Sequence, residues 1–377
     1  TTAVTLASRG VSIAGIEYNP FIRFVAATKA VIPLMSSREL EHTIVQLETE
    51  GLPTEACPIP ELSTLHNTQY SDAQTIQLLL SIYQCINDLD TPPAIRSALH
   101  LGLAATIEAV FHLRKDGRAL RYVPKPIILP VRQLLSRHWR TILADVQAYE
   151  SSPPPLPRVK PLFAVYGGSA TNLQTLSTVD GDELCLAPNT FDTMIYSPPY
   201  VNNFDYSEVY KLELWLLHFI ESYDAWKELR LGTIRSHHSL VFPETQHLGT
   251  DPRTQAIAKQ LHAMGMSICL PDEERARVRR VIVGYFDDMY LALCEQWRVL
   301  KPGGIISYIV ANSRHYYLPV ATDVILAEIA RCIGFELLDL IVLRKRNGRT
   351  RQKLFLRESV VFVRKPIVTT NASISAR

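Results

Sequence analysis

The residues of this chain with the clearest chemical potential are Ser197, Pro198, Pro199 and Tyr200, which end an apolar run. Ser197 offers a hydroxyl oxygen as an acceptor, and Pro198 has no N–H and a fixed φ that helps to hold its carbonyl outward as a second acceptor. Two acceptors that converge on one point suit an amino group. Tyr200 adds a flat face, on which stacking of a nucleobase contributes roughly 1–3 kcal/mol. The tetrapeptide therefore predicts a site for an amino group on a planar ring, and a polyproline turn that caps a strand is the alternative interpretation.

The element that must position these residues is the run Phe191 to Tyr196. A short apolar run closed by turn residues is typical of a buried parallel strand. Such a strand delivers Ser197 to the carboxyl edge of its sheet, where open α/β folds bind ligands.

Composition and charge describe an ordinary globular protein of one large or two smaller domains, with 377 residues, 47% hydrophobic and 20% charged. No run approaches the ~18 apolar residues of a membrane helix, and the first residues do not have the pattern of a secretory signal. The six cysteines show no CxxC spacing, so we expect a cytoplasmic protein with neither disulfides nor a metal site.

Lysine and arginine are concentrated in two runs, although the net charge is only +2. The first run holds Arg114, Lys115, Arg118, Arg121, Lys125, Arg132, Arg137 and Arg140, and the second holds Arg344, Lys345, Arg346, Arg349, Arg351, Lys353 and Arg357. Contact with phosphates and a solvated helical face are both open interpretations of the first run.

The N-terminal segment predicts a helix over 1–9 with Gly10 as its C-cap, then a buried strand from Val11 to Glu17. An acid at the end of the second strand of a dinucleotide-type fold commonly binds the ribose hydroxyls of the cofactor. Glu17 is the candidate for that role, and an exposed strand-end carboxylate is the alternative.

The region from 33 to 160 departs from alternating strands and helices. Amphipathic helices are expected near 75–89 and 94–113, broken by prolines. We therefore predict a large helical insertion that ends in a stiff proline-rich connector over 151–157.

The motif at Ser197 resembles that of the DNA amino-methyltransferases, Asp/Asn/Ser-Pro-Pro-Tyr/Phe/Trp, which methylate N6 of adenine or N4 of cytosine. Its Ser form favours cytosine N4 in that family. Further matches follow in the family's order at Tyr18-Asn19-Pro20, at the turn from Gly167 to Leu173, and at Leu300-Lys301-Pro302-Gly303-Gly304 before a strand over 305–310. The resemblance implies an α/β fold of class I methyltransferase type, with a Rossmann-like mixed sheet, and S-adenosylmethionine as the cofactor.

The resemblance also implies cofactor contacts. Glu17 would bind the ribose, and Tyr18 would lie near the adenine. Ser169 stands where the family usually has an acid, so a backbone contact at Ala170 and the motif residue Ser197 complete the expected set. The family's glycine-rich turn usually ends in Gly-x-Gly-Thr-Thr, and this chain opens at Thr1-Thr2. We expect that the first strand and this turn are truncated; the alternative is a protein that has lost its cofactor loop.

Two other regions are expected to contact DNA. The segment 227–272 has weak periodicity and several basic residues, which suits a loop-rich target-recognition region. A hairpin is predicted over 335–363, turning at Asn347-Gly348. The resemblance implies that its first strand runs parallel to its neighbours, which would carry the second basic run to the catalytic side. The predicted DNA-binding residues are Asn203, Arg235, Arg346, Arg349 and Arg351. The predicted domain limits are 1–32 for the cofactor-binding part, 33–160 for the insertion, 161–226 for the core with the motif, 227–272 for target recognition, 273–366 for the rest of the core and 367–377 for a flexible tail.

The sequence thus predicts a DNA methyltransferase that acts on an exocyclic amino group, cytosine N4 before adenine N6, in restriction-modification or related defence. DNA is the expected partner, and a cognate restriction endonuclease is implied by resemblance alone; neither a membrane nor a metal is expected. An RNA or tRNA amino-methyltransferase and a catalytically silent DNA-binding subunit remain the alternatives.

Overall fold

A computed structural model describes residues 2–49, 57–115, 120–125, 128–151, 162–179, 181–201, 205–315, 318–346 and 356–367. The chain forms two compact units. The first unit comprises Thr1–Gly168, Ser177–Glu183 and Tyr206–Arg230, and the second unit comprises Ser169–Leu176, Leu184–Asp205 and Leu231–Arg377. The predicted domain limits stay a prediction beside this division.

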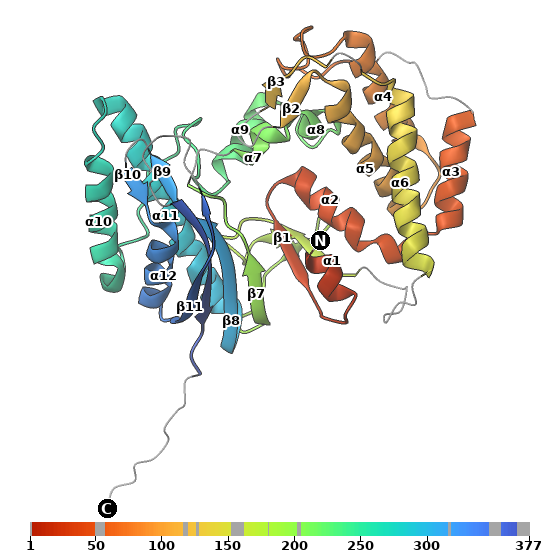
Figure 1. Cartoon of the computed structure of the whole chain (residues 1–377). Helices are drawn as coiled ribbons and strands as arrows, with labels where there is room; N and C mark the ends of the chain where they lie inside the picture. The colour runs from red at the N-terminus through yellow and green to blue at the C-terminus, as the bar shows by residue number, and fades with distance from the viewer. Residues whose placement is uncertain are drawn as a thin grey trace, which may run out of the picture. The chain divides into compact units, whose positions relative to one another are not determined.

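In the first unit, β1 (Ala14–Glu17) pairs in parallel with β4 (Ala164–Gly167), so that Glu17 lies opposite Gly167. The sheet order is β1-β4-β5-β6, with β5 at Leu176–Ser177 and β6 at Glu183–Leu184. Helix α1 (Thr2–Ala7) precedes β1, and α2 (Pro20–Ala30) follows it (Figure 1). Asn19 caps α2, because its Oδ1 accepts from the N–H of Phe21 at 3.0 Å and Pro20 occupies the first helical turn.

Between β1 and β4 the chain is mostly helical, as the sequence predicts. The elements are η1 (Ile32–Leu34), α3 (Ser37–Thr49), α4 (Ala73–Asp88), α5 (Pro93–Val110), the short strands β2 (Leu113–Lys115) and β3 (Leu120–Tyr122), and α6 (Val131–Ser151). Helices α5 and α6 approach closely at Gly102, where an added Cβ would lie 2.4 Å from Cδ1 of Trp139. The Trp139 Nε1–H also donates to the Leu99 carbonyl at 2.9 Å, so one buried side chain fixes this packing.

The chain after the motif forms α7 (Tyr206–Val209), α8 (Lys211–Leu216) and α9 (Tyr223–Leu231). The sequence predicts one helix here, and the structure divides it at Tyr210 into two short ones. The apolar face expected from Tyr210, Leu214, Trp215, Leu216 and Leu217 is present, because the last four are buried in the core of the first unit and Tyr210 packs against it.

The second unit contains a mixed sheet in the order β11-β12-β8-β7. Strand β7 (Phe191–Tyr196) pairs in parallel with β8 (Leu300–Ala311), and the strands β12 (Leu356–Arg364) and β11 (Glu336–Arg346) follow in antiparallel pairings. The remaining elements are η2 (Pro252–Thr254), α10 (Gln255–Met266), α11 (Asp272–Val299), β9 (Ser313–His315), β10 (Leu318–Val320) and α12 (Thr322–Ile333). The predicted mixed α/β class is confirmed.

The last predicted strands need one correction. The expectation that the first strand of the hairpin runs parallel to its neighbours is wrong, because β11 pairs with β12 and that pairing is antiparallel. Two successive antiparallel pairings nevertheless give β11 the direction of β8 and β7. The carboxyl end of β11 therefore lies at the same sheet edge as the carboxyl ends of β7 and β8, as the sequence predicts.

The strand before the motif is less buried than predicted. Ile195 is 57% exposed, and Thr193 is exposed as well. The reason is the sheet order, since β7 is the last strand of this sheet among the described residues. Gly304 allows β8 to approach β7 closely, because a Cβ at this position would lie 2.9 Å from the carbonyl oxygen of Asp192 in β7.

The sequence predicts a loop-rich segment over 227–272, but the structure forms the helix α10 within it. Ile257 and Leu261 are buried on the side of α10 that packs with α11. Tertiary burial of these two residues outweighs the weak periodicity of the surrounding sequence. No helix in the described part of the chain combines the length and the apolar character needed to cross a membrane.

Candidate functional site

Ser197 follows directly after β7, at the carboxyl edge where Tyr196 lies opposite Tyr308 of β8. Its Oγ–H donates to the carbonyl oxygen of Ile309 at 2.9 Å. Because this bond uses the hydroxyl proton, the lone pairs of Oγ are the groups left for a ligand. The structure therefore orients Ser197 as an acceptor, which is the role that an incoming amino group requires.

Tyr200 is fixed at its far end. Its hydroxyl donates to Oε1 of Glu358 on β12 at 2.7 Å, and the other carboxylate oxygen accepts from Nε of Arg344 on β11. Pro198 is buried and Pro199 is half-buried between these two anchored residues. The motif is thus attached to the sheet at both Ser197 and Tyr200. Sequence reasoning missed Glu358, whose signal is an acid that directly follows the basic run from Arg344 to Arg357.

Three tyrosines lie in or against the core of the second unit close to the motif; Tyr285 and Tyr308 are buried, and Tyr196 is half-buried. The rings of Tyr196 and Tyr308 stack with centroids 5.7 Å apart, and Tyr285 of α11 is fully buried in the same core. Burial raises the pKa of all three phenols well above the ordinary value. They therefore remain neutral and serve as packing residues rather than as proton acceptors.

The backbone after the motif is held by His315. Its Nε2 lies 2.9 Å from the carbonyl oxygen of Val201, and since a carbonyl only accepts, Nε2 carries the proton. Burial lowers the pKa of His315 to about 4, so the ring is neutral near pH 7. Asn203, a predicted DNA contact, lies outside the described residues.

Glu17 lies at the carboxyl end of β1 in the first unit. Its Oε1 accepts from the Asn19 N–H at 2.8 Å, and its carbonyl oxygen accepts from the Gly168 N–H at 3.3 Å. Burial raises the pKa of Glu17, while the backbone N–H groups of Tyr18 and Asn19 act in the opposite direction. The carboxylate is therefore immobilised beside the turn that follows β4.

Tyr206 accompanies Glu17, and the sequence did not indicate this. Burial raises the pKa of its phenol, with further increases from the Tyr210 phenol and the Glu17 carboxylate. The residue is 49% exposed although it begins α7, so it is not the core residue that its position suggests. Tyr18 is half-buried against the core of the first unit, Thr2 is exposed at the start of α1, and Thr1 lies outside the described residues.

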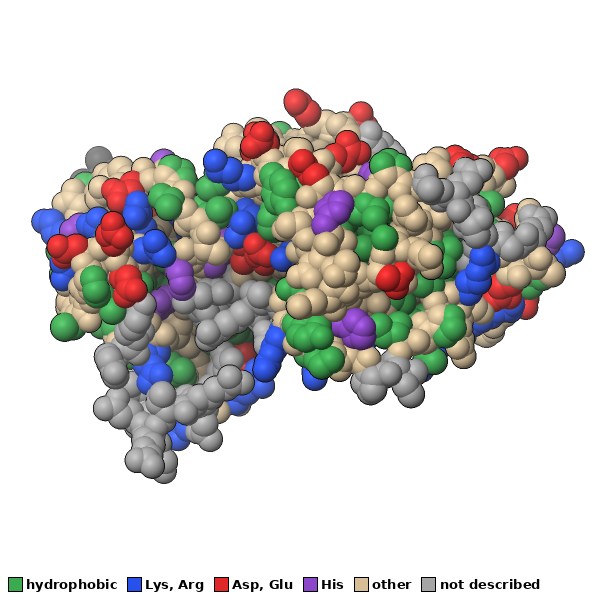
Figure 2. Space-filling model, turned by 90° about the horizontal axis from the view of Figure 1, so that it is seen from above, with side chains coloured by type: hydrophobic (Ala, Val, Ile, Leu, Met, Phe, Trp, Pro, Cys, Tyr) green, Lys and Arg blue, Asp and Glu red, His purple; other side chains and the backbone are tan. Residues whose placement is uncertain are grey.

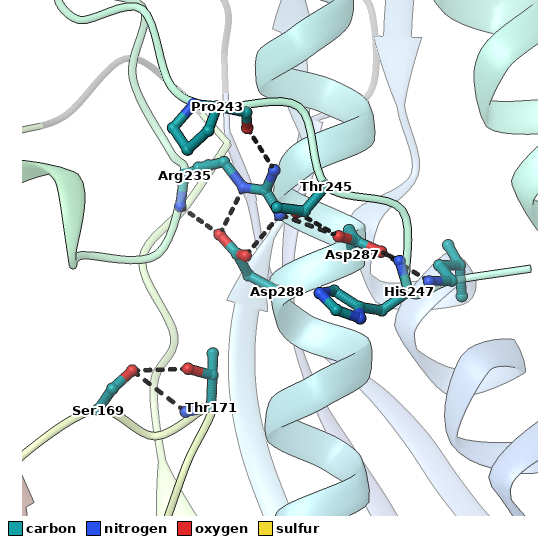
Figure 3. Close-up of polar contacts among 9 residues, drawn as sticks. Ser169, Thr171, Arg235, Pro243, Thr245, His247, Asp287 and Asp288 are labelled. Atoms are coloured by element: carbon teal, nitrogen blue, oxygen red, sulfur yellow. Dashed lines mark hydrogen bonds and ion pairs between the residues drawn. The ribbon is translucent and has the colours of Figure 1, made fainter. Parts of the chain in front are cut away.

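The turn at Ser169 is closed by its own side chains. Ser169 Oγ lies 2.8 Å from Thr171 Oγ1 and accepts from the Thr171 N–H at 3.3 Å (Figure 3). Ser169 therefore shapes the turn, and Ala170 stands between the two bonded residues. The predicted cofactor contacts at Ser169 and Ala170 stay predictions.

Arg235 requires a correction. It is 6% exposed, and its guanidinium donates to both Asp287 and Asp288 of α11 and to the carbonyl oxygen of Pro243 (Figure 3). A side chain whose donors are satisfied inside the protein is not available to DNA phosphates. The predicted DNA contact at Arg235 does not fit this burial, and the residue instead fixes the segment before α10 to α11.

The first basic run is also partly engaged within the protein. Lys115 pairs with Glu213, Nζ of Lys125 donates to the Glu108 carbonyl oxygen at 2.7 Å, and Arg140 donates to Glu48 at 2.5 Å. These contacts argue against a dedicated phosphate-binding role for the three residues. On the face shown in Figure 2, lysines and arginines are interspersed with acids rather than gathered in one field.

The remaining predicted DNA contacts belong to the hairpin tip. The backbone of Arg346 ends β11, whereas Arg349 and Arg351 lie outside the described residues, as does the predicted turn at Asn347-Gly348. Arg344, two residues before the strand end, projects a side chain that is 67% exposed. The described end of β11 lies at the sheet edge where the motif begins.

Comparison with known proteins gives a consistent class. The type II methyltransferase M.AvaI of Nostoc sp. is 26% identical over 297 residues, which cover 72% of this chain and 59% of that protein, and M.AvaI of Anabaena variabilis gives the same figures. M.BsoBI of Geobacillus stearothermophilus, also a type II methyltransferase, is 22% identical over 414 residues, covering 97% of this chain and 78% of that protein. No family model matches the chain.

The chain is therefore similar to type II methyltransferases, which agrees with the methyltransferase class that the Ser-Pro-Pro-Tyr motif predicts. The chain spans 59% of the length of each of the two M.AvaI proteins.

Proposed function

We propose that the protein transfers a methyl group from S-adenosylmethionine to an exocyclic amino group of a DNA base, with cytosine N4 favoured over adenine N6. The observation that carries this proposal is the orientation of Ser197, whose hydroxyl donates a hydrogen bond to the Ile309 carbonyl oxygen at 2.9 Å. An acceptor directed in this way suits an amino group and does not suit a carbonyl group. The relatives named above support DNA as the substrate and restriction-modification as the context.

The residues of the first unit fit part of the cofactor. Glu17 presents a carboxylate held by the Asn19 N–H, and Gly168 beside it has a φ of +148°, which a residue with a side chain rarely adopts. A fixed acid next to a glycine turn suits the two hydroxyls of a ribose. S-adenosylmethionine, when bound, supplies the methyl group as an electrophile on its sulfonium. Its adenine would lie near Tyr18, Ser169 and Ala170, as the resemblance implies.

The motif residues would act on the base. The target nucleotide leaves the duplex, at a cost of a few kcal/mol, and its ring stacks on Tyr200. Its amino group donates hydrogen bonds to Ser197 Oγ and to the Pro198 carbonyl oxygen, which raises electron density on the nitrogen. The nitrogen lone pair would form the bond to the methyl carbon while the bond between that carbon and the sulfonium sulfur breaks, with its electron pair staying on the sulfur as a neutral thioether. The methylated nitrogen would then lose a proton to water. Positioning of the reactants is the main contribution of the protein.

The test compares Ser197→Ala and Tyr200→Ala with the parent protein, using DNA and tritium-labelled S-adenosylmethionine. Loss of one hydrogen bond to the amino group is expected to lower methyl transfer by about tenfold. Ser267→Ala, at the exposed end of α10, is the matched control and is expected to retain the parent rate. Parent rates in both motif variants would contradict the proposal.

Mass analysis of nucleosides from the methylated DNA identifies the target atom. N4-methylcytosine is the expected product, and N6-methyladenine would overturn the preference while keeping the reaction class. Competition by unlabelled RNA tests the alternative substrate, because an RNA enzyme would lose its DNA signal.

A further inference from the structure

Glu358 connects the motif to the basic end of the hairpin. Its two carboxylate oxygens accept from the Tyr200 hydroxyl and from the Arg344 guanidinium. We propose that Glu358 is a positioning residue for methyl transfer, which holds the Tyr200 ring in place for the target base, with Arg344 as its counter-charge. This inference rests on the function proposed above and assigns a role to a residue outside the motif.

The contact with Tyr200 restrains the ring at the end opposite to its backbone. The hydroxyl oxygen of a tyrosine lies on the axis of χ2, so a 2.7 Å bond from it fixes χ1 when the acceptor is itself immobile. The preference of the phenol O–H for the plane of its ring then restricts χ2. Glu358 meets that condition, because it is 8% exposed and lies within β12, paired to Ala311 of β8. A base that stacks on Tyr200 therefore meets a face that is already in position.

A β-bulge brings the counter-charge to this place. Val342 lies opposite Ser359, and the register then shifts, so that Arg344 rather than Leu343 lies opposite Glu358. Without the extra residue, a leucine would face the carboxylate. Bulges of this kind re-aim side chains near functional sites. The irregularity thus places a cationic partner beside a buried acid.

The same hairpin contains a matched pair without this connection to the motif. At its opposite end, Arg364 donates to Glu336 at 2.7 Å, and these two residues also lie directly across the strands. Both pairs join β11 to β12, so both contribute to the hairpin. A role in positioning Tyr200 belongs only to Glu358, which makes Glu336→Gln the control.

The test measures single-turnover methyl transfer to plasmid DNA and, separately, DNA affinity and thermal stability. Loss of a hydrogen bond to a charged group predicts a rate lowered by about tenfold or more in Glu358→Leu, and Tyr200→Phe should match it. The double variant, Glu358→Leu with Tyr200→Phe, is expected to be no slower than the slower single variant, since each change removes the same hydrogen bond. Glu358→Gln keeps an acceptor and should recover part of the rate, and Glu336→Gln should equal the parent. Additive losses, or a loss confined to stability, would overturn the proposal.

A second measurement separates this inference from the proposed function. Fluorotyrosine at position 200 reports the environment and mobility of the ring through its fluorine NMR resonance. This resonance should shift or broaden in Glu358→Leu, and it should change less in Glu358→Gln. Glu336→Gln should leave the resonance unchanged. An unchanged resonance in Glu358→Leu refutes the positioning role even if the protein methylates DNA. A parent that moves no methyl group refutes the proposed function, whatever the resonance does.

Discussion

The strongest test of the second unit is the substitution Asp287→Ala in α11. The Asp287 carboxylate is 1% exposed and accepts four hydrogen bonds. Oδ1 accepts from the backbone N–H groups of His247 at 2.5 Å and Leu248 at 2.6 Å. Oδ2 accepts from the Thr245 hydroxyl at 2.8 Å and from Arg235 at 3.0 Å. One side chain therefore attaches the segment before α10 to the long helix.

The expected cost follows from the groups that lose their acceptor. Each orphaned buried donor costs about 1–3 kcal/mol, and breaking a buried ion pair costs about 3–5 kcal/mol. Arg235 keeps Asp288, which accepts at 2.6 Å and 3.0 Å, so the ion-pair cost is only partly incurred. We expect Asp287→Ala to lower the free energy of unfolding by about 4 kcal/mol. Asp287→Asn, which keeps one acceptor oxygen, should lose about half of that.

The assay is urea unfolding followed by tryptophan fluorescence, together with hydrogen exchange of the Leu248 amide as a local probe. Asp272→Ala is the control on the same helix, because the Asp272 side chain is 91% exposed, and its effect should stay within about 0.5 kcal/mol. The reasoning is refuted if Asp287→Ala is as stable as this control, or if the Leu248 amide keeps its parent protection.

Two other changes test buried charges and protonation. Lys115→Met leaves the buried Glu213 carboxylate without its cation and should lower stability by about 3 kcal/mol in thermal unfolding; a Tm within a degree of the parent would contradict this. The pKa of His315 is lowered from 6.5 to about 4, by burial first and also by His238, so the unfolded chain binds more protons between these values. Stability should therefore fall by about 3 kcal/mol as pH drops from 6.5 to 4, and His315→Gln should lack that part of the loss in unfolding measured across this range.

Local signals made much of the fold predictable. Apolar periodicity identified α4 and α5, Gly334 with a φ of +130° ends α12 as expected, and β7 stops where the prolines begin. The motif also predicted the class of protein to which the relatives belong. These features depend on residues that are close in sequence, so a single sequence displays them.

The errors concern contacts between distant residues. Arg235 has the composition of a phosphate contact, but its partners Asp287 and Asp288 stand on another helix, far along the chain. The pairing of Glu358 with Arg344 depends on a bulge, which no periodicity reveals. Ile257 and Leu261 lie in a segment of weak periodicity, and their burial depends on the packing of α10 with α11. In each case the tertiary partner, rather than the local pattern, decides the role.

The parallel pairing of β1 with β4 has a consequence for the order of folding. Among the described strands, β1 finds its hydrogen-bond partner only after the whole helical insertion has been synthesised. The insertion is rich in local contacts, which form quickly, whereas a pairing of such high contact order is slow. A nascent chain should therefore acquire its helices first, and the pairing of β1 with β4 should form later.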